Sequence, residues 1–349
     1  MARVRLRLTG CCLALAGLLG LAGPAAAQPD VKSPTIDAIK RRGALVCGVD
    51  TGIPGYAYKD AKGGWQGLDV AYCRAIADAV LGSPDKVRFV GTTAQERFTK
   101  LQSGAIDVLI RDSEQSFLRD TELGLAEPAV NFFTGQTFMV NRNLGVSHTR
   151  DLNGATICVL KGTTAEPNIA DYNRLNSIKI GTLSFDKPEQ AFAAAEAGRC
   201  DGYSDDGGAV AAARSAMKRP ADWIFLPEMI GGLSPLGPFT RAGDEAWTRL
   251  VKWVHYAMLE GEALGITRDN VEEQRKTPED PELRRFLGLE GDFGKLLGVD
   301  NHWSYRIIRD IGNYGEVYDG TFGYKGLGLP RGMNNLPDGG GLQTFPTWH

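Results

Sequence analysis

The order of strand-like and helix-like segments constrains the fold of this chain most strongly, because the two kinds alternate in two successive sets. The first set, read from apolar runs and helical spacing, comprises strands at 44–49, 87–90 and 106–110 and helices at 68–81 and 93–103. The second set begins near Leu152 and comprises strands at 156–160, 178–183, 202–204 and 224–226 and helices at 165–175, 188–197 and 208–218. This βαβ rhythm predicts an α/β fold with parallel-rich sheets and flanking helices. In such sheets, ligands bind outside the carboxyl ends of the strands, so two lobes facing each other predict a cleft.

The first 27 residues have the features of a secretory signal peptide. Arg3, Arg5 and Arg7 form a basic start, residues 13–21 form the core of an apolar stretch, and the alanines at 25–27 form a small-residue cleavage site before position 28. The apolar stretch is too short for a spanning helix of ~20 residues. We therefore expect an exported, soluble mature protein, with an uncleaved membrane anchor as the alternative.

The charge of the mature chain argues against nucleic acid as a partner. Removing residues 1–27 removes three arginines and no acid, which leaves 36 Lys and Arg against 42 Asp and Glu, a net charge of −6. Nucleic-acid binding requires a basic face. The remaining length of about 320 residues is enough for two compact lobes.

Four cysteines remain after the signal peptide, an even number in an oxidising compartment. They allow three pairings, of which we favour Cys47–Cys73 and Cys158–Cys200. Cys47 lies in a strand on which the helix carrying Cys73 should pack, and the other two lie in or beside strands of the second set. A metal site would need clustered cysteines, which are absent, and free buried thiols are the other alternative.

Two polar features, a turn and an aspartate, follow strands of the second set. Gly162, Thr163 and Thr164 form a strand-to-helix turn, and the spacing from Thr163 to Glu166 is that of a capping box. Backbone N–H groups at a helix start attract an anion such as a carboxylate, whereas Asp206, at the end of a short strand, can bind an ammonium. The pair predicts an amino-acid pocket. The alternative is an ordinary helix cap and a loop aspartate.

Five segments together resemble one protein family. They are 42–49, 67–75, 162–166, 235–238 and 312–317, which read RGALVCGV, GLDVAYCRA, GTTAE, PLGP and GNYGEV. The chain resembles, from about 36 to 342, the periplasmic amino-acid-binding proteins of ABC transporters (solute-binding protein family 3), and within them the general L-amino-acid-binding branch.

The resemblance implies a two-lobed periplasmic-binding-protein-like fold of type II. Lobe 1 would comprise 31–139 and 236–349, and lobe 2 would comprise 140–235. The two crossing segments would lie near 138–141 and 231–235. The lobes would close over a ligand by a hinge motion.

The resemblance also implies ligand contacts. Matched by position, Arg119 would grip the α-carboxylate together with Thr163 and Thr164, and Asp206 would grip the α-ammonium. An arginine fork suits a carboxylate, and an aspartate facing an ammonium makes a charge-assisted hydrogen bond. Asp205 could stand in for Asp206, and Arg119 could instead be a surface residue at a helix start.

The loop at 110–116 departs from the branch. Arg111 is kept, but Asp112 stands where an amide is typical and Glu114 adds an acid, while Asp50 replaces a small neutral residue at the end of the first strand. These acids would make the side-chain end of the pocket negative and suit a cationic side chain, because unpaired buried acids are costly. The alternative is that the acids pair with Arg111 and Arg119 or face solvent.

An aromatic loop follows the first strand, where Tyr56 is a candidate to cover the ligand. The alternative role is core or lid packing.

We expect a non-enzymatic binding subunit that delivers a polar or cationic L-amino acid to an ABC permease in the inner membrane, and that acts as a periplasmic monomer without cofactor or metal. One alternative is an exported cyclohexadienyl-type dehydratase of the same fold, with Glu114 as general acid. Another is a ligand sensor that presents its closed form to a receptor. None of the four histidines lies in the expected cleft loops.

Overall fold

Two separate sheets organise the chain, as the sequence predicts. The computed structural model describes residues 31–348, so the expected signal peptide at 1–27 lies outside the described residues. Residues 31–348 belong to one compact unit. The first sheet has the order β4-β1-β5 and is parallel; its strands are β1 (Leu45–Val49), β4 (Val87–Gly91) and β5 (Val108–Leu109). Within residues 31–348, no helix is long and apolar enough to cross a bilayer.

The second sheet is mixed. Its order is β11-β7-β10-β8-β9, and β12 pairs with the first half of β7, ahead of the residues that pair with β11. Its strands are β7 (Phe132–Asn141), β8 (Thr156–Leu160), β9 (Gly181–Phe185), β10 (Gly202–Asp206), β11 (Trp223–Phe225) and β12 (Ile230–Leu236). β8 pairs in parallel with β9 and β10, whereas β7 is antiparallel to β10, β11 and β12. The helices of this part are α5 (Ala165–Asn176), α6 (Pro188–Glu196) and α7 (Gly207–Ala216).

Helices surround the first sheet. The N-terminal ones are α1 (Pro34–Arg42), α2 (Leu68–Leu81), α3 (Arg97–Gln102) and α4 (Phe117–Glu122). The C-terminal ones are α8 (Glu245–Ala263), α9 (Val271–Gln274), α10 (Pro281–Phe286), α11 (Phe293–Leu296), α12 (Trp303–Asp310) and α13 (Tyr314–Thr321). Short strand pairs complete the fold, namely β2 (Tyr58–Lys59) with β3 (Trp65–Gln66) and β6 (Leu125–Ala126) with β13 (Thr240–Arg241).

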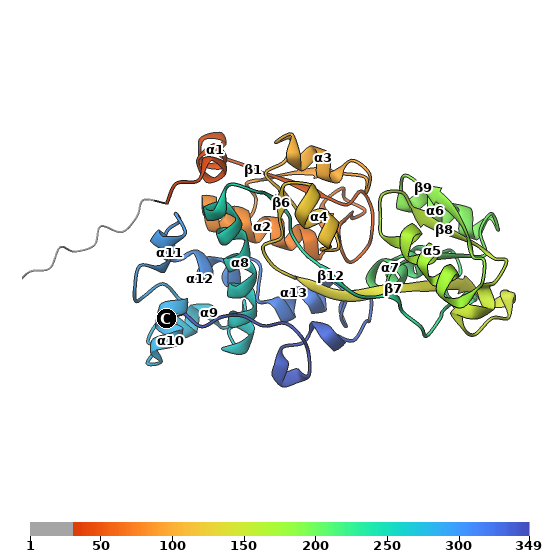
Figure 1. The fold of residues 1–349 in the computed structure, drawn as a ribbon. Helices are drawn as coiled ribbons and strands as arrows, with labels where there is room; N and C mark the ends of the chain where they lie inside the picture. Colours follow the sequence, from red (N-terminus) through yellow and green to blue (C-terminus); the bar gives the residue numbers. More distant parts are fainter. Residues whose placement is uncertain (1–30, 349) are drawn as a thin grey trace, which may run out of the picture. The chain divides into compact units, whose positions relative to one another are not determined.

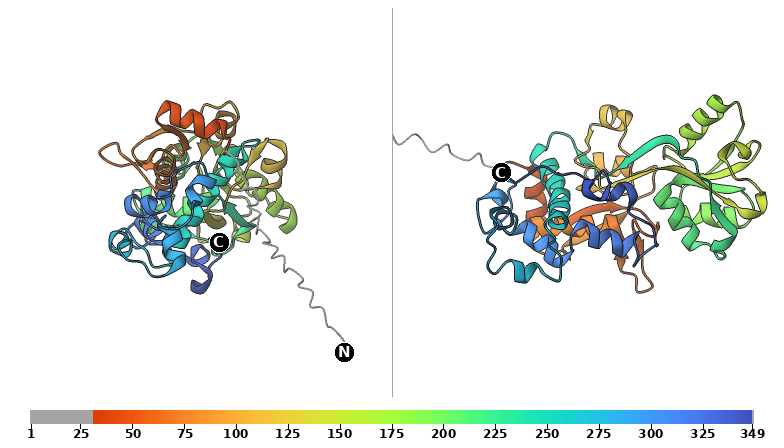
Figure 2. Two further views of the ribbon diagram at one scale, coloured as in Figure 1. Left: turned by 90° about the vertical axis from the view of Figure 1, so that its left-hand side faces the viewer. Right: turned by 90° about the horizontal axis from the view of Figure 1, so that it is seen from below.

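The long strands β7 and β12 run side by side from the first sheet region into the second sheet (Figure 1; Figure 2, right). Their antiparallel pairing extends from Phe132 opposite Leu236 to Gln136 opposite Ile230, with a register shift before Leu233. The segments near 138–141 and 231–235 that were expected as crossings fall within these two strands. The sequence did not predict β7 as a strand.

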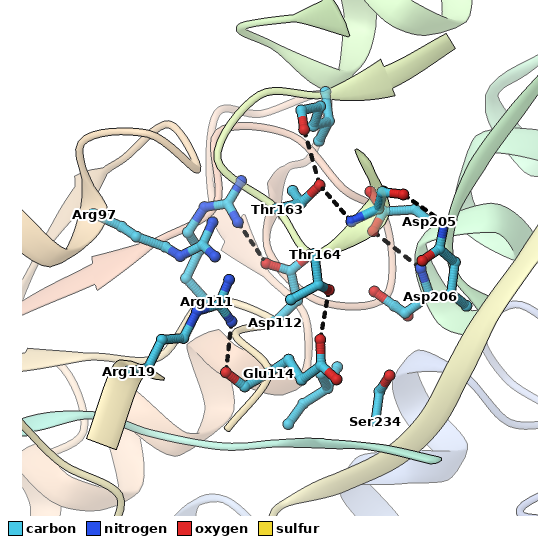
Figure 3. A pocket seen from close by; sticks show the side chains of 14 residues that line it. Arg97, Arg111, Asp112, Glu114, Arg119, Thr163, Thr164, Asp205, Asp206 and Ser234 are labelled. Atoms are coloured by element: carbon cyan, nitrogen blue, oxygen red, sulfur yellow. Dashed lines mark hydrogen bonds and ion pairs between the residues drawn. The ribbon is translucent and has the colours of Figure 1, made fainter. Parts of the chain in front are cut away.

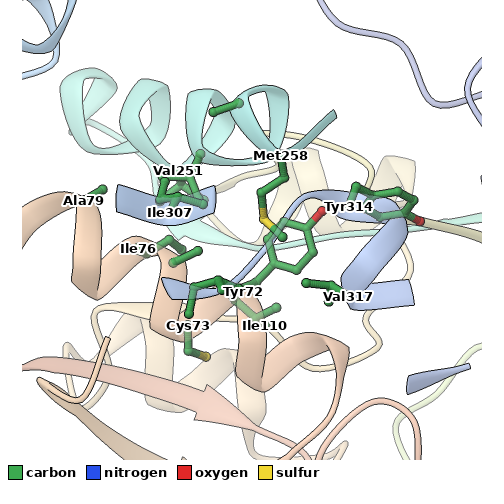
Figure 4. Packing of buried hydrophobic residues seen from close by; sticks show 14 of the residues in the cluster. Tyr72, Cys73, Ile76, Ala79, Ile110, Val251, Met258, Ile307, Tyr314 and Val317 are labelled. Carbon is green, nitrogen blue, oxygen red and sulfur yellow. The ribbon is translucent and has the colours of Figure 1, made fainter. Parts of the chain in front are cut away.

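Helix α2 occupies the centre of the largest core (Figure 4). It packs against β1 and against α8, α12 and α13, which bring Met258, Ile307 and Val317 against Tyr72 and Ile76. Because helices cover it on several sides, α2 is apolar around most of its circumference. The result is a fixed platform for the loops at the strand ends.

Both expected disulfides are present, and the free-thiol alternative is therefore wrong. Cys47–Cys73 ties β1 to α2, and Cys158–Cys200 ties β8 to the turn before β10. Each bridge anchors a strand whose carboxyl end faces the site described below.

Candidate functional site

A small polar cavity lies where the carboxyl ends of strands from both sheets meet (Figure 3). It has about 30 Å³ available to the centres of water-sized molecules. Its lining residues are mostly polar or charged, and they are Arg97, Arg111, Asp112, Glu114, Arg119, Gln136, Leu160, Thr163, Thr164, Ala165, Asp205, Asp206, Ser234 and Leu236. The three arginines lie on one side and the two neighbouring aspartates on the other (Figure 3). Such an arrangement suits a small molecule that carries both charges.

Arg119 lines this cavity and is not a surface residue, since it is only 9% exposed. It lies in α4, where its backbone N–H donates to the Ser116 hydroxyl that caps the helix. Its guanidinium donates to the Glu114 carbonyl at 2.5 Å and lies over the Phe98 ring at 5.1 Å. These contacts aim a buried cation at the cavity.

The turn from β8 to α5 brings Thr163 and Thr164 to the cavity. Gly162 has φ +77°, a conformation that favours glycine. The Thr163 hydroxyl donates to the Leu160 carbonyl at 2.8 Å, and the Thr164 hydroxyl donates to the Glu114 carboxylate.

The expected capping box is wrong. The N-cap of α5 is Thr164, which makes no side-chain cap bond, and the Glu166 carboxylate accepts a hydrogen bond from Ser184 on β9. The Ala165 N–H donates to the Thr163 hydroxyl at 3.3 Å and Pro167 has no N–H, so in the first turn of the helix the Glu166 N–H is the group left for an anion.

Asp205 and Asp206 end β10 and both line the cavity. The Asp205 carboxylate accepts hydrogen bonds from Tyr203 at 2.7 Å and from the Asp206 N–H at 3.0 Å. Burial raises the pKa of Asp205 to about 6 and raises that of Asp206 well above its ordinary value, and the neighbouring acids contribute. A ligand cation placed here would reverse that effect, because an opposite charge favours the carboxylate form.

Comparisons with known proteins agree with this geometry. Residues 45–278 match the model of the bacterial extracellular solute-binding proteins, family 3. The glutamate/glutamine/aspartate/asparagine-binding protein BztA of Rhodobacter capsulatus is 45% identical over 335 residues, which is 96% of each chain.

The chain belongs to this family.

Two further relatives of this solute-binding protein are similar over nearly their whole length. The general L-amino acid-binding periplasmic protein AapJ of Rhizobium johnstonii is 42% identical, over 95% of this chain and 98% of that protein. A solved periplasmic binding protein from Brucella ovis with glutathione bound has a TM-score of 0.86 and 44% identity, over 89% of this chain and 98% of that one. The expected two-lobed α/β fold is thereby confirmed.

The acidic residues at and near the loop 110–116, where the sequence departs from the family branch, already have partners in the solute-binding protein. Arg111, 2% exposed, pairs with Asp50 and with Asp112, the latter at 2.9 Å, and donates to the Thr92 carbonyl at 3.1 Å. Asp50 is fully buried and does not line the cavity, whereas Asp112 and Glu114 do. Asp50 and Asp112 therefore pair with Arg111, which was the alternative to facing the ligand. Their charges are not free for a cationic side chain.

Tyr56 also lies behind the cavity lining. It is fully buried, and its hydroxyl donates to Asp206 at 2.8 Å. Its ring packs edge-on against Phe132 and Phe322. Tyr56 therefore reaches the candidate site through Asp206.

Arg97 is the charged cavity residue that the sequence interpretation missed. It is 2% exposed, and its guanidinium makes one hydrogen bond, to the Gly162 carbonyl at 3.3 Å. Its Nε and Nη1 atoms are buried without an acceptor among residues 31–348. Burial and the two neighbouring arginines lower its pKa. Ala94, Arg97 and Leu101 share a buried face at helical spacing, so a charged residue at a core position was the available signal.

Proposed function

We propose that this family 3 solute-binding protein binds a free L-amino acid with an acidic or amide side chain and delivers it to the permease of an ABC importer. Arg119 and the turn at Thr163 and Thr164 would hold the α-carboxylate, and Asp206 would hold the α-ammonium. Arg97 would bind the oxygen of the side chain.

The observation that carries this proposal is that two guanidinium nitrogens of Arg97, Nε and Nη1, have no acceptor among residues 31–348, in a cavity that already holds charges of both signs. A buried donor without an acceptor is costly, and a ligand oxygen would satisfy it. Because Asp50 and Asp112 pair with Arg111, the available hydrogen-bond positions favour a side chain with acceptors over a cationic one. The names of BztA and AapJ, which state acidic, amide and general L-amino acids, support this class.

The fold supports binding by hinge closure. We retain 31–139 with 236–349 as lobe 1 and 140–235 as lobe 2, because β1, β4 and β5 of the first sheet lie in the former, β8 to β11 of the second sheet lie in the latter, and β7 and β12 run between them. Arg97, Glu114 and Tyr56 of lobe 1 donate to or accept from Gly162, Thr164 and Asp206 of lobe 2. The closed form would be the one that the permease recognises.

The remaining parts of the proposal follow from family membership. Since the family is extracellular, we propose export through the leader at 1–27, a periplasmic location and action as a monomer. The relatives are named as binding proteins, which favours binding over turnover. No group of three or more His, Cys, Asp or Glu residues in the described part of the chain could hold a metal ion.

Calorimetry tests the function. Residues 31–349 contain every described helix and strand and both disulfides, so this segment is purified, unfolded and refolded to strip bound ligand, and titrated with each common L-amino acid. We expect saturable 1:1 binding, tightest for glutamate, glutamine, aspartate and asparagine, and recovery of the ligand unchanged.

Glutathione belongs in the same panel, because its γ-glutamyl end carries a free α-amine and α-carboxylate and because the Brucella ovis protein was solved with it. A protein that binds no amino acid would refute the proposal. Binding of glutathione alone would replace the ligand class.

A further inference from the structure

The two carboxylate oxygens of Asp206 differ in their hydrogen bonds. Oδ1 accepts three hydrogen bonds, from the N–H groups of Gly208 at 2.9 Å and Ala209 at 3.0 Å and from the Tyr56 hydroxyl at 2.8 Å. None of the side-chain hydrogen bonds of Asp206 within residues 31–348 reaches Oδ2, and Asp206 lines the cavity. The carboxylate is therefore anchored through one oxygen and open at the other.

Tyr56 is held rigidly in the position from which it donates. It is fully buried, with ring centroids 5.3 Å from Phe132 and 4.7 Å from Phe322. Its hydroxyl lies against the start of α7, where a Cβ added to Gly208 would be 2.5 Å from the Tyr56 oxygen. The absence of a side chain at position 208 thus lets the hydroxyl reach Asp206.

The two partners come from different parts of the fold. Tyr56 follows β1 of the first sheet, whereas Asp206 ends β10 of the second, 150 residues later. The hydrogen bond can form only when the two sheets are brought as close as they are here.

We propose that Tyr56 is a positioning residue of the amine site, which orients Asp206 by occupying Oδ1 and so leaves Oδ2 for the α-ammonium of the ligand. This inference rests on the proposed function. It makes the amine site incomplete until the lobes approach, so that ligand binding and closure favour each other.

The charges around Asp206 explain why this hydrogen bond affects its ionisation. The titratable groups that face Asp206, its neighbour Asp205 or the cavity between the lobes are Tyr56, Arg97, Arg111, Asp112, Glu114, Arg119 and Tyr203. Burial, Asp205 and Asp112 raise the pKa of Asp206, and the Ala209 N–H and the Tyr56 hydroxyl lower it. Loss of the hydroxyl therefore raises the pKa of Asp206 further, and protonation removes the charge that holds the ammonium.

Tyr56→Phe tests this inference, because phenylalanine keeps the ring packing and removes only the donor. The dissociation constant of L-glutamate is measured by calorimetry between pH 5 and pH 8.5 for residues 31–349. We expect about tenfold weaker binding at pH 7.5, since one hydrogen bond to a charged group is lost. The pH below which affinity falls should move upward by about one unit, because Asp206 is protonated more easily.

Two further variants separate positioning from packing. Gly208→Ala displaces the same hydroxyl from the opposite side and should shift the pH profile in the same direction. Tyr58→Phe, on the neighbouring strand β2, removes a hydroxyl that makes no hydrogen bond to the described residues and should match the wild type.

Unchanged affinity in Tyr56→Phe would overturn the inference, and so would weaker binding with an unshifted pH profile. If the wild type binds no amino acid at pH 7.5, the proposed function fails and this inference fails with it. Wild-type binding that Tyr56→Phe leaves intact would overturn only the role of Tyr56.

Discussion

Arg97→Met is expected to weaken ligand binding and to stabilise the ligand-free protein. The side chain of Arg97 is 2% exposed, and its Nε and Nη1 groups lack acceptors among residues 31–348. A hydrogen bond to a charged group contributes about 1.5–3 kcal/mol, so two such bonds to a side-chain oxygen of the ligand are worth roughly 3 kcal/mol or more. At about 1.4 kcal/mol per factor of ten, the affinity for L-glutamate should fall at least about 100-fold.

The free protein should respond in the opposite direction. A buried cation without full compensation costs desolvation energy, and methionine of similar length fills the same space without charge. We expect the free energy of unfolding in urea to rise by about 1–2 kcal/mol. L-alanine, which lacks a side-chain acceptor, should bind Arg97→Met nearly as well as the wild type.

Lys100→Met on the same helix is the matched control. Lys100 forms a partly exposed ion pair with Glu96 at 2.8 Å, which contributes little. It should change neither affinity nor stability by more than about 0.5 kcal/mol. Equal losses of glutamate and alanine binding in Arg97→Met would assign Arg97 to the α-carboxylate instead. A destabilised free protein would show that Arg97 supports the fold.

Three other changes test the surrounding structure. Replacing Cys158 and Cys200 by alanine opens a loop of 42 residues and should lower the free energy of unfolding in urea by roughly 4 kcal/mol; a loss below about 1 kcal/mol would contradict this. Burial raises the pKa of Glu260 from 4.5 to about 8, so the carboxyl group is protonated in the folded protein and its contribution to stability is lost as the pH rises through that window. Between pH 5 and pH 8, the free energy of unfolding in urea should fall by about 1 kcal/mol per pH unit, and Glu260→Gln should flatten this slope. Parallel curves for the wild type and the variant would refute the assignment. Asp50→Asn leaves Arg111 with one carboxylate partner and should lower the free energy of unfolding in urea by about 2 kcal/mol. The calorimetric affinity for lysine should not change. A large loss of lysine binding would instead support a ligand with a cationic side chain.

Local pattern was sufficient to predict the main elements of the fold and part of the candidate site. The alternation of strands and helices, the turn at Gly162 and the end of β10 at Asp206 depend on short-range spacing and turn chemistry. Both disulfides could be favoured because each joins a strand to an element that should lie beside it. Such inferences need no knowledge of how distant side chains meet.

Partners far apart in the chain were not predictable in this way. Tyr56 was a candidate either to cover the ligand or to pack in the core; it packs in the core, and nothing in the sequence indicated that it donates to Asp206, which lies 150 positions later. The sequence left open whether the acids near the loop face the ligand or pair with an arginine, and Asp50 pairs with Arg111. The capping box failed for the same reason, because Ser184 on another strand engages Glu166. In each case tertiary packing sets the partner of a polar side chain, and the local sequence does not show that partner.

The tail shows the same limit. Its Gly- and Pro-rich composition predicts an irregular backbone, and the last twenty residues have only short 3₁₀ turns among those described. Yet Trp348 is buried, with ring centroids 5.5 Å from Trp303 and from Phe286. Buried side chains such as Trp348, Leu336 and Asn334 therefore hold in place a segment whose backbone has no regular structure beyond the short turns.

The donors and acceptors without partners in the cavity indicate which kind of ligand would fit it. Arg111 is paired on three sides and can offer little to a ligand. Within residues 31–348, Nε and Nη1 of Arg97 have no acceptor, and the side-chain hydrogen bonds of Asp206 leave its Oδ2 open. Each buried group that remains open costs the free protein about 1–3 kcal/mol, and a molecule with an amine at one end and oxygens at the other would recover that energy. The open groups in the cavity therefore agree with the proposed binding of an acidic or amide amino acid, in which the ligand supplies the partners that the described residues do not.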